Sequence, residues 1–576
     1  MSGAAADRAR RPPLLGYAAA VRHLGPRQAW RNLVHRLWRR RRGCRAARAG
    51  GSDLAFAGRG ASLPMRSASA RLEGDTFTAL GRSRRIGDPP DWNAEEPLLW
   101  LFNLHYFDYL EALPPERRVA LVLDWIARHP PRPGAAGWMP YPLSLRLRNW
   151  TRLLRQDLAW PEESRARVLA SIEAQGNCLA ANVEEHLRGN HLLENGLTLA
   201  LLSASFRGRA AVSWGRRGRA ILEGELDEQF LRDGGHFERS PMYHALLTAG
   251  LVELAAALPP GDVLGERIRE RLPGLLGFLL ALRHPDGGIA LFNDSALDIA
   301  PEAADLQREV YALRLDAPAS ERAAFPETGY WVWRGGGDAL LVDAGPIGPD
   351  YVPAHAHGDI FSFELSLGGR RVVVDGGTST YEAGAERDWV RSTRAHNTVE
   401  VDGMDQCEFF DAFRVGRRGR PHDVRASLSP AGLRLEGWHD AYRRLPGGPR
   451  HRRELLFRPP GVLLVWDRVD SGRDNAVVAR VRFAPGLAVA STDPTQARVD
   501  VPGRALVARA FGALLEVEPG HYAPRFGERQ PCRVLALRAR ANQDFGLILA
   551  PVGLAVTIDA AGAQLAGERL TRGISA

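Results

Sequence analysis

The residues with the clearest chemical potential lie in the segment 355–359, His-Ala-His-Gly-Asp, which runs into the alternating sequence Ile-Phe-Ser-Phe-Glu-Leu. Asp375 and His396 follow shortly downstream. If the strand period of two extends back through the segment, its two histidines and its aspartate point to the same side. Imidazole and carboxylate groups suit a zinc site or proton transfer. The alternative is a set of histidines that only form hydrogen bonds.

A second polar cluster lies on the helix predicted over residues 184–206. The downstream half of this helix is strongly apolar, yet Asn190, His191, Glu194 and Thr198 form one polar stripe along it. Polar groups that are buried without partners cost free energy. The stripe therefore predicts either a hydrogen-bonded seam between helices or one wall of a wet cleft.

A third group lies where the glycine-containing loop 232–240 enters the next helix. Tyr243 occupies the first turn of that helix, and His236 precedes it in the loop. A tyrosine at such a junction is commonly a residue at the edge of the core. His236, Asn149 and His105 are further candidates for lining the same cavity and, with Glu194, for binding the substrate.

These residues must be positioned by a long helical region between residues 96 and 320. Apolar residues recur there every three or four positions, and Pro or Gly marks many boundaries. The predicted helices cover 98–110, 115–128, 143–158, 162–180, 184–206, 209–231, 243–258, 263–283 and 301–313. Such a series with short loops predicts helical hairpins, an α/α toroid or a solenoid.

After residue 320 the pattern changes to short alternating or β-branched runs separated by Gly, Asp and Pro, for example at 330–334, 339–343, 461–467 and 535–540. This pattern predicts an antiparallel all-β domain, most simply a large sandwich. The chain is therefore expected to be an α+β multidomain protein with three parts: a basic N-terminal arm and loosely ordered connection (1–95), a helical domain (96–320) and a β-domain (321–576).

Composition excludes several classes of protein. The chain contains no lysine, which excludes a Schiff-base lysine and the lysine of a phosphate-binding P-loop. Residues 1–50 hold 13 arginines and one aspartate, whereas the net charge of the whole chain is +9. The remainder is thus slightly negative, and no nucleic-acid partner is predicted for it.

Residues 18–42 place Trp30, Leu33 and Leu37 at helical spacing with arginines on the other face. Such a helix predicts either peripheral contact with an anionic membrane or packing on the body of the protein. No window reaches the length of a transmembrane span, and the N-terminus makes a poor signal peptide. The expected location is cytoplasmic or peripheral to the inner membrane, with the periplasm as the alternative.

Four motifs, in the expected order, resemble the heparinase II/III family of polysaccharide lyases, which is related to alginate lyases. They are Gly-Asn-His-Leu-Leu-Glu-Asn (189–195), Asp-Gly-Gly-His-Phe-Glu-Arg-Ser-Pro-Met-Tyr-His (233–244), His-Ala-His-Gly-Asp-Ile-Phe-Ser-Phe-Glu-Leu (355–365) and Arg-Ser-Thr-Arg-Ala-His-Asn-Thr-Val (391–399). The resemblance covers roughly residues 96–480 and looks closest to members linked to bacterial exopolysaccharide biosynthesis. It implies an N-terminal (α/α) toroid followed by a C-terminal antiparallel β-sandwich.

The resemblance also implies residue roles. Asn190 and His191 would hold the carboxylate of an acidic polysaccharide, with Glu194 supporting them, and Tyr243 and His355 would be catalytic. A second set matches the ligands of a metal, usually a structural zinc: His357, Asp375 and His396. A His/Asp/His set is acceptable to zinc, and the metal would hold the neighbouring catalytic histidine in place.

The implied reaction is β-elimination beside a uronic acid, in which a base removes the C5 proton and an acid protonates the departing O4. Two other functions stay open. A glycoside hydrolase would need two opposed carboxylates, for which Glu194, Glu238 and Asp233 are available. A non-catalytic component of a polysaccharide assembly or export system would dock on a membrane through residues 18–42.

Overall fold

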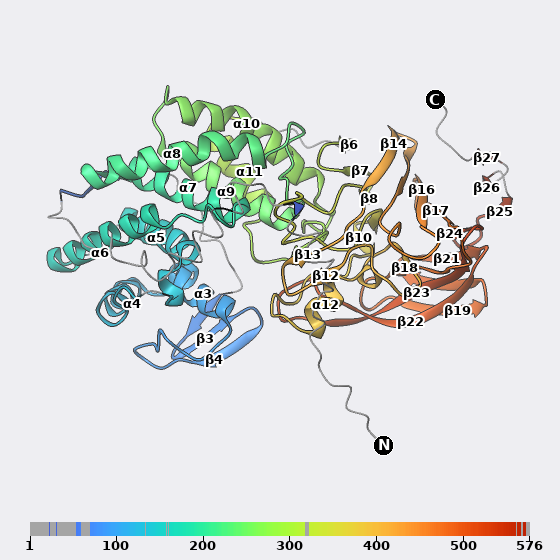
Figure 1. The fold of residues 1–576 in the computed structure, drawn as a ribbon, viewed down its shortest axis with the longest axis horizontal. Coiled ribbons are helices and arrows are strands. Elements are labelled where there is room, and N and C mark those ends of the chain that lie inside the picture. Colours follow the sequence, from blue (N-terminus) through green and yellow to red (C-terminus); the bar gives the residue numbers. More distant parts are fainter. Residues whose placement is uncertain are drawn as a thin grey trace, which may run out of the picture.

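The computed structural model describes residues 22, 23, 30, 53–58, 70–132, 134–156, 158, 160–316, 322–559, 562–565 and 568–571. Helices dominate the first half of this part of the chain and strands the second, as predicted (Figure 1). The helix predicted over 18–42 lies outside the described residues except at positions 22, 23 and 30. No helix in the described part is both long enough and apolar enough to cross a membrane.

Each helix predicted between residues 96 and 320 is present. The helices are α3 Leu98–Tyr106, α4 Pro115–Arg128, α5 Pro140–Arg155, α6 Glu162–Ala181, α7 Gly189–Ser205, α8 Arg209–Gln229, α9 Pro241–Ala257, α10 Val263–Ala281 and α11 Ala303–Ala312. α7 begins five residues later than the predicted Glu184, because Arg188 and Gly189 have φ of +62° and +55°. A right-handed helix cannot continue through residues with a left-handed backbone, so residues 184–188 form a turn instead.

α7 is the central helix of this half, since it packs against α5, α8 and α9. Its apolar residues contribute to two cores, one shared with α3–α6 and the other with α8–α11. A helix buried on most sides must carry its polar residues toward partners or a cavity. The polar stripe at the N-terminal end of α7 therefore needs hydrogen-bond partners or a cavity beside it.

Residues 70–95, expected to be loosely ordered, instead contain a three-stranded sheet, and that expectation is corrected for this stretch. Its strands are β2 Arg71–Glu73, β3 Thr76–Ala79 and β4 Arg82–Arg85. Phe77 is fully buried, with its ring 5.0 Å from that of Trp100 and 5.2 Å from that of Tyr109. Phe77, together with the buried Leu72, Ala79 and Ile86, packs this sheet onto the helical core.

Three large antiparallel sheets make up most of the second half, which also contains a two-stranded hairpin described below and a small sheet of β25 (Val556–Asp559), β26 (Gly562–Leu565) and β27 (Glu568–Thr571). A five-stranded sheet has the order β10 (Arg370–Val373), β9 (Ser362–Leu367), β8 (Asp338–Asp343), β7 (Tyr330–Gly335), β6 (Arg322–Phe325). A four-stranded sheet contains β11 (Val399–Val401), β18 (Ala476–Arg482), β23 (Gln530–Arg540) and β22 (Leu514–Tyr522).

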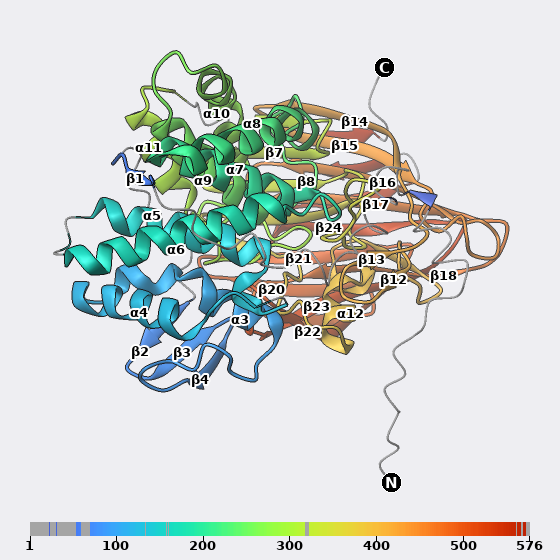
Figure 2. The same ribbon diagram turned by 60° about the vertical axis from the view of Figure 1, so that its left-hand side comes forward.

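An eight-stranded sheet has the order β14 (Pro421–Ser429), β15 (Gly432–His439), β16 (Arg450–Arg458), β17 (Val462–Asp470), β24 (Asp544–Pro551), β21 (Arg504–Phe511), β20 (Gln496–Val501), β19 (Ala488–Asp493). The three sheets share one apolar core, which includes Phe363, Val465 and Leu535. In Figure 2 the helices lie in front of these strands, so the two halves face each other along one side.

Two short elements lie between the sheets and the helical half. They are the helix α12 (Ala385–Arg391) and the hairpin β12 (Phe409–Phe410) and β13 (Arg414–Val415). Buried arginines fix this hairpin: the guanidinium of Arg387 donates to the carbonyl of Ala412, and that of Arg391 donates to the carbonyls of Asp411 and Ala412. These hydrogen bonds hold the tip of the β12–β13 hairpin in place.

Candidate active site

A cavity of about 640 Å³ lies between the two halves of the chain. The helical half contributes residues of α3, α5, α7 and α9, and the β half contributes the segments around His355, Tyr381 and Phe413. Asn190, His191, Tyr243 and His355, the four residues predicted to be catalytic, all line it. Residues far apart in sequence thus meet at one wall.

His355 is buried and bonded through both ring nitrogens. Its Nδ1 lies 2.9 Å from Oδ2 of Asp294, and its Nε2 lies 3.2 Å from Nδ2 of Asn190. A carboxylate partner places the proton on Nδ1 and leaves the lone pair on Nε2. That nitrogen is on the cavity side, where Asn190 is also found.

Asp294 is a positioning residue that the sequence patterns did not single out. Its carboxylate receives both terminal nitrogens of Arg387, at 2.5 and 2.7 Å, and its Oδ1 also lies 2.9 Å from Nε2 of His357. Although burial would raise it, Arg387 and the two histidines hold the pKa of Asp294 well below its ordinary value. The polar pair Asn293-Asp294 directly after an apolar run was the available signal.

Asn190 is fixed by Glu238. The carboxylate accepts from the backbone N of Asn190 at 3.0 Å and from its Nδ2 at 2.9 Å. Gly189 allows this approach, because a Cβ there would lie 2.2 Å from Oε1 of Glu238. The side-chain Oδ1 of Asn190 has no hydrogen-bond partner among the described residues. A buried amide with a spare acceptor indicates a contact that a ligand completes.

His191 extends into the cavity from the first turn of α7. Its side chain is 32% exposed, its Nδ1 lies 3.1 Å from Oε1 of Glu184, and its ring packs 4.5 Å from that of Tyr141. Burial would lower the pKa of His191, but the carboxylate of Glu184 raises it above the ordinary value. The imidazole is therefore favoured in its cationic form, which suits an anionic ligand group.

Tyr243 sits at the start of α9, where Ser240 caps the helix by accepting from the backbone N of Tyr243 at 3.2 Å. Its ring centroid lies 4.0 Å from that of His355, and its hydroxyl lies 3.3 Å from the hydroxyl of Tyr381. Burial and the neighbouring Tyr381 raise the pKa of Tyr243 well above its ordinary value. The phenol is therefore protonated at neutral pH.

None of the four residues predicted to bind substrate lines this cavity. Each is buried and bonded elsewhere: Glu194 accepts from Arg148 at 2.6 Å, His236 pairs with Gln229 at 3.0 Å, Asn149 donates to Asp108 at 2.7 Å, and His105 accepts from Trp125 at 3.1 Å. Residues of these types satisfy one another in the core when partners are within reach. Asn149 still acts on the cavity indirectly, because its partner Asp108 lines it.

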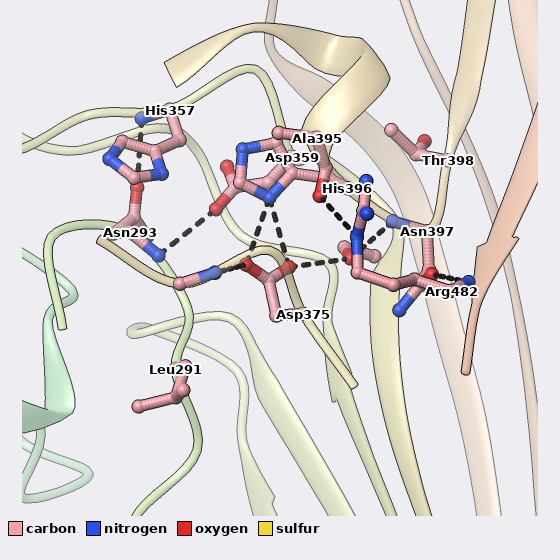
Figure 3. Close-up of polar contacts among 12 residues, drawn as sticks. Leu291, Asn293, His357, Asp359, Asp375, Ala395, His396, Asn397, Thr398 and Arg482 are labelled. Carbon is pink, nitrogen blue, oxygen red and sulfur yellow. Dashed lines mark hydrogen bonds and ion pairs between the residues drawn. The ribbon is translucent and has the colours of Figure 1, made fainter. Parts of the chain in front are cut away.

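Beneath the cavity wall lies a group that could hold a metal ion. Ligand atoms of His357, Asp359 and His396 lie within 4.8 Å of one another, and all three residues are buried (Figure 3). The predicted ligand Asp375 is not in this group; its carboxylate oxygens lie 2.9 and 3.0 Å from Nδ1 of His396. Figure 3 shows this contact. The structure thus offers Asp359 where the family resemblance implied Asp375.

The side chains of His357, Asp359 and His396 are suited to binding a metal cation. Nδ1 of His357 and Nε2 of His396 have no hydrogen-bond partner among the described residues, although both rings are fully buried. Burial lowers the pKa of His357 to about 4, so its ring is neutral. Burial also raises the pKa of Asp359 to about 6, although the neighbouring His396 opposes this shift. Although burial would lower it, the carboxylates of Asp375 and Asp359 raise the pKa of His396, so a bound metal would take the place of a proton on that ring. Two imidazoles and a carboxylate are a donor set that zinc accepts.

Family comparisons cover most of the chain. The heparinase II/III N-terminal family model matches residues 115–311, and the heparinase II/III-like C-terminal model matches residues 317–557. Among curated proteins, the heparin-sulfate lyase of Bacteroides stercoris is 24% identical over 379 residues, 59% of this chain and 53% of that protein. That of Pedobacter heparinus is 24% identical over 333 residues, 52% of this chain and 47% of that protein. These alignments thus span about half the length of the two lyases.

A third curated relative, the FtsZ-localized protein C of Caulobacter vibrioides, is 28% identical over 425 residues, 67% of this chain and 65% of that protein. Solved structures agree on the fold. A structure of heparinase III superposes with a TM-score of 0.70 at 17% identity, over 85% of this chain and 86% of the other. The heparan sulfate lyase HepC mutant of Pedobacter heparinus gives 0.62 at 16% identity, over 86% of each chain. With both of its halves matched by family models, the chain belongs to the heparinase II/III family.

Proposed function

We propose that the chain is a polysaccharide lyase that cleaves a uronate-containing polysaccharide by β-elimination. One observation carries the proposal: Asn190, Tyr243 and His355 come from three separate segments and meet at one cavity wall, with Asn190 3.2 Å from the histidine and the tyrosine ring 4.0 Å from it. A carboxylate binder, an acid and a base are the three groups that the reaction requires.

His355 is the base in this mechanism. Its Nδ1 proton is held by Asp294, so Nε2 accepts the C5 proton of the uronate. The imidazolium that forms is stabilised by the buried, ionised carboxylate of Asp294, which Arg387 keeps in place. The electron pair of the C5–H bond moves toward the uronate carboxyl group.

Asn190 and His191 hold that carboxyl group. The substrate displaces Nδ2 of Asn190 from Nε2 of His355, which frees an amide N–H for the carboxylate and the imidazole lone pair for the C5 proton. This amide donor and the cationic imidazole of His191 stabilise the enolate-like intermediate. The carboxylate of Glu238 orients Asn190 through a hydrogen bond, and the carboxylate of Glu184 stabilises the cationic form of His191.

Tyr243 is the acid. Its raised pKa keeps the phenol protonated until the C4–O4 bond breaks, when the departing O4 takes the phenolic proton and the C4=C5 double bond forms. Proton return from the imidazolium of His355 to the phenolate resets the site, and the packed rings keep the two groups close.

The proposal includes three finer points. Zinc would be held by His357, Asp359 and His396, with Asp375 orienting His396; when bound, it would supply a fixed positive charge that ties the loops beside His355 together. The helices would form an α/α toroid and the sheets a β-sandwich. The polymer would be an acidic one handled in exopolysaccharide synthesis or turnover, in the cytoplasm or beside the inner membrane.

Incubation with a panel of uronate polymers tests the reaction, with ultraviolet absorbance of the unsaturated uronate end as the signal. Tyr243→Phe and His355→Ala should each abolish product formation. Matched controls are Tyr311→Phe, at a 51% exposed position on α11, and His422→Ala on β14, both outside the cavity lining. Full activity in both site variants would reject the assigned roles. Products without a double bond would indicate hydrolysis instead.

The hydrolase alternative is disfavoured by the positions of its candidate carboxylates. Glu194 is paired with Arg148, Glu238 holds Asn190, and Asp233 accepts from Thr328, so none of the three carboxylates lines the cavity. The non-catalytic, membrane-docked alternative has a separate test. Liposome binding by the full chain should be compared with that of a chain lacking residues 1–50, and unchanged binding would reject docking through residues 18–42.

A further inference from the structure

We propose, on the basis of the lyase function above, that the cavity selects a uronate polysaccharide without sulfate groups. Heparin-type polymers carry sulfates beside their carboxylates, and a sulfate is ionised at every physiological pH. An anion that enters an apolar cavity needs a cationic partner there. The charges of the cavity wall therefore decide which polymers fit.

The described cavity wall contains no arginine, and the chain contains no lysine. The basic side chains of the wall are His191, which together with Asn190 serves one carboxylate, and His355, whose Nδ1 is paired with Asp294. The other polar groups that could donate to an anion, among them Asn103, Ser379, Thr380 and the tyrosine hydroxyls, are neutral. The cavity wall therefore offers partners for one negative charge on the reacting sugar, that of the uronate carboxylate.

Arginines close in sequence to the wall are already paired with carboxylates. These pairs are Arg82 with Glu96, Arg387 with Asp294, Arg414 with Asp411, and Arg525 with Asp298. Recruiting Arg387 to a sulfate would leave a buried carboxylate without its partner, whereas the other three arginines are solvent-exposed and lie outside the wall. The wall itself adds two carboxylates, Asp108 and Glu382, which repel further negative charge.

Aromatic rings occupy much of the remaining wall. Phe102, Tyr141, Tyr381 and Phe413 line it, and Phe413 is 40% exposed at the tip of the β12–β13 hairpin. The apolar C–H faces of sugar rings pack on such side chains, and a cavity with aromatic walls and few polar groups is suited to that contact. Sulfation of a ring that packs there would place a charge against an apolar surface.

The test compares matched polymers. Every uronate polymer that the enzyme cleaves is sulfated chemically, and kcat/KM for both forms is measured at one fixed ionic strength. Sulfation should lower kcat/KM by roughly tenfold or more. Equal or faster cleavage of the sulfated forms would overturn this inference and leave the lyase function intact. Failure to cleave either form of any polymer would overturn the lyase function and this inference with it.

A charge-reversal variant tests the cause. Glu382→Arg introduces a cation into the wall and should raise the ratio of kcat/KM for sulfated over unsulfated polymer by several fold. Glu223→Arg, an exposed position on α8 outside the wall, makes the same change in net charge and should leave the ratio unchanged. A ratio that does not respond to Glu382→Arg would contradict the claim that missing cations set the selectivity.

Discussion

Asp294 lies 2.9 Å from Nδ1 of His355, although the two residues are 61 positions apart and belong to opposite halves of the chain. The aspartate follows α10, whereas the histidine follows β8. The other carboxylate oxygen of Asp294 lies 2.9 Å from Nε2 of His357. One carboxylate therefore positions the proposed catalytic base and a proposed metal ligand together.

Replacing Asp294 by Asn should lower kcat by roughly 10³–10⁴-fold, because an amide no longer selects the tautomer with the proton on Nδ1 of His355. KM should change little, since Asp294 does not line the cavity. Arg387 would also lose its ionic partner, so thermal unfolding must be measured in parallel to separate instability from lost catalysis. A folded variant within tenfold of the parent kcat would contradict the positioning role.

Glu184→Gln should shift the alkaline limb of the kcat/KM profile to lower pH. The pKa of His191 is raised above its ordinary value of 6.5, so the cation persists above that pH and is lost as the pH rises through the raised pKa. Removing the Glu184 carboxylate lowers this pKa and the limb moves down with it. Glu185→Gln, whose partner is Arg217, is the matched control and should leave the limb in place.

Gly189→Ala should reduce kcat/KM by roughly 10²-fold. The added Cβ would lie 2.2 Å from Oε1 of Glu238, so the carboxylate must move and release Asn190, one of the proposed donors to the substrate carboxylate. The positive φ of +55° adds backbone strain. Gly224→Ala on α8 meets no atom within 4 Å and should be neutral or slightly stabilising. Unchanged kinetics in Gly189→Ala would show that Glu238 does not position Asn190.

Purified protein should contain zinc, and a chelator should lower its melting temperature. The zinc content and the melting temperature test the metal site without an activity assay. Asp359→Asn should abolish zinc binding if Asp359 is a ligand, whereas Asp375→Asn should weaken it by roughly 10–100-fold if Asp375 only orients His396. The reverse pattern would make Asp375 the ligand. Metal-free protein whose stability is indifferent to added zinc would reject the metal site.

Glu194→Gln should destabilise the fold by about 1–3 kcal/mol, because the buried guanidinium of Arg148 loses one charged partner but keeps Glu253. KM should be unchanged at temperatures where the variant is folded, since Glu194 lies outside the cavity wall. Glu516→Gln breaks an exposed pair with Arg538 and should cost about 1 kcal/mol or less. A large rise in KM for Glu194→Gln would restore its assignment as a substrate-binding residue.

The sequence alone determined the order of the helical and β halves and singled out four residues of the cavity wall, Asn190, His191, Tyr243 and His355. Apolar spacing of three to four located the helices because each helix must bury one face, and alternation located the strands for the same reason. The motifs around Asn190, Tyr243 and His355 marked them as the proposed reacting groups through their resemblance to the family, and their residue types suit β-elimination. All of this information is local in the chain.

Only the tertiary structure decided which polar residues face the cavity and which satisfy one another in the core. Glu194 shares the polar stripe of α7 with Asn190. It pairs with Arg148 from α5, however, and does not face the cavity. Asp294 and Arg387, which are 93 positions apart, form the support of His355 without any local pattern. The partner of a buried charge is chosen by packing between distant segments, and neither periodicity nor spacing records that choice.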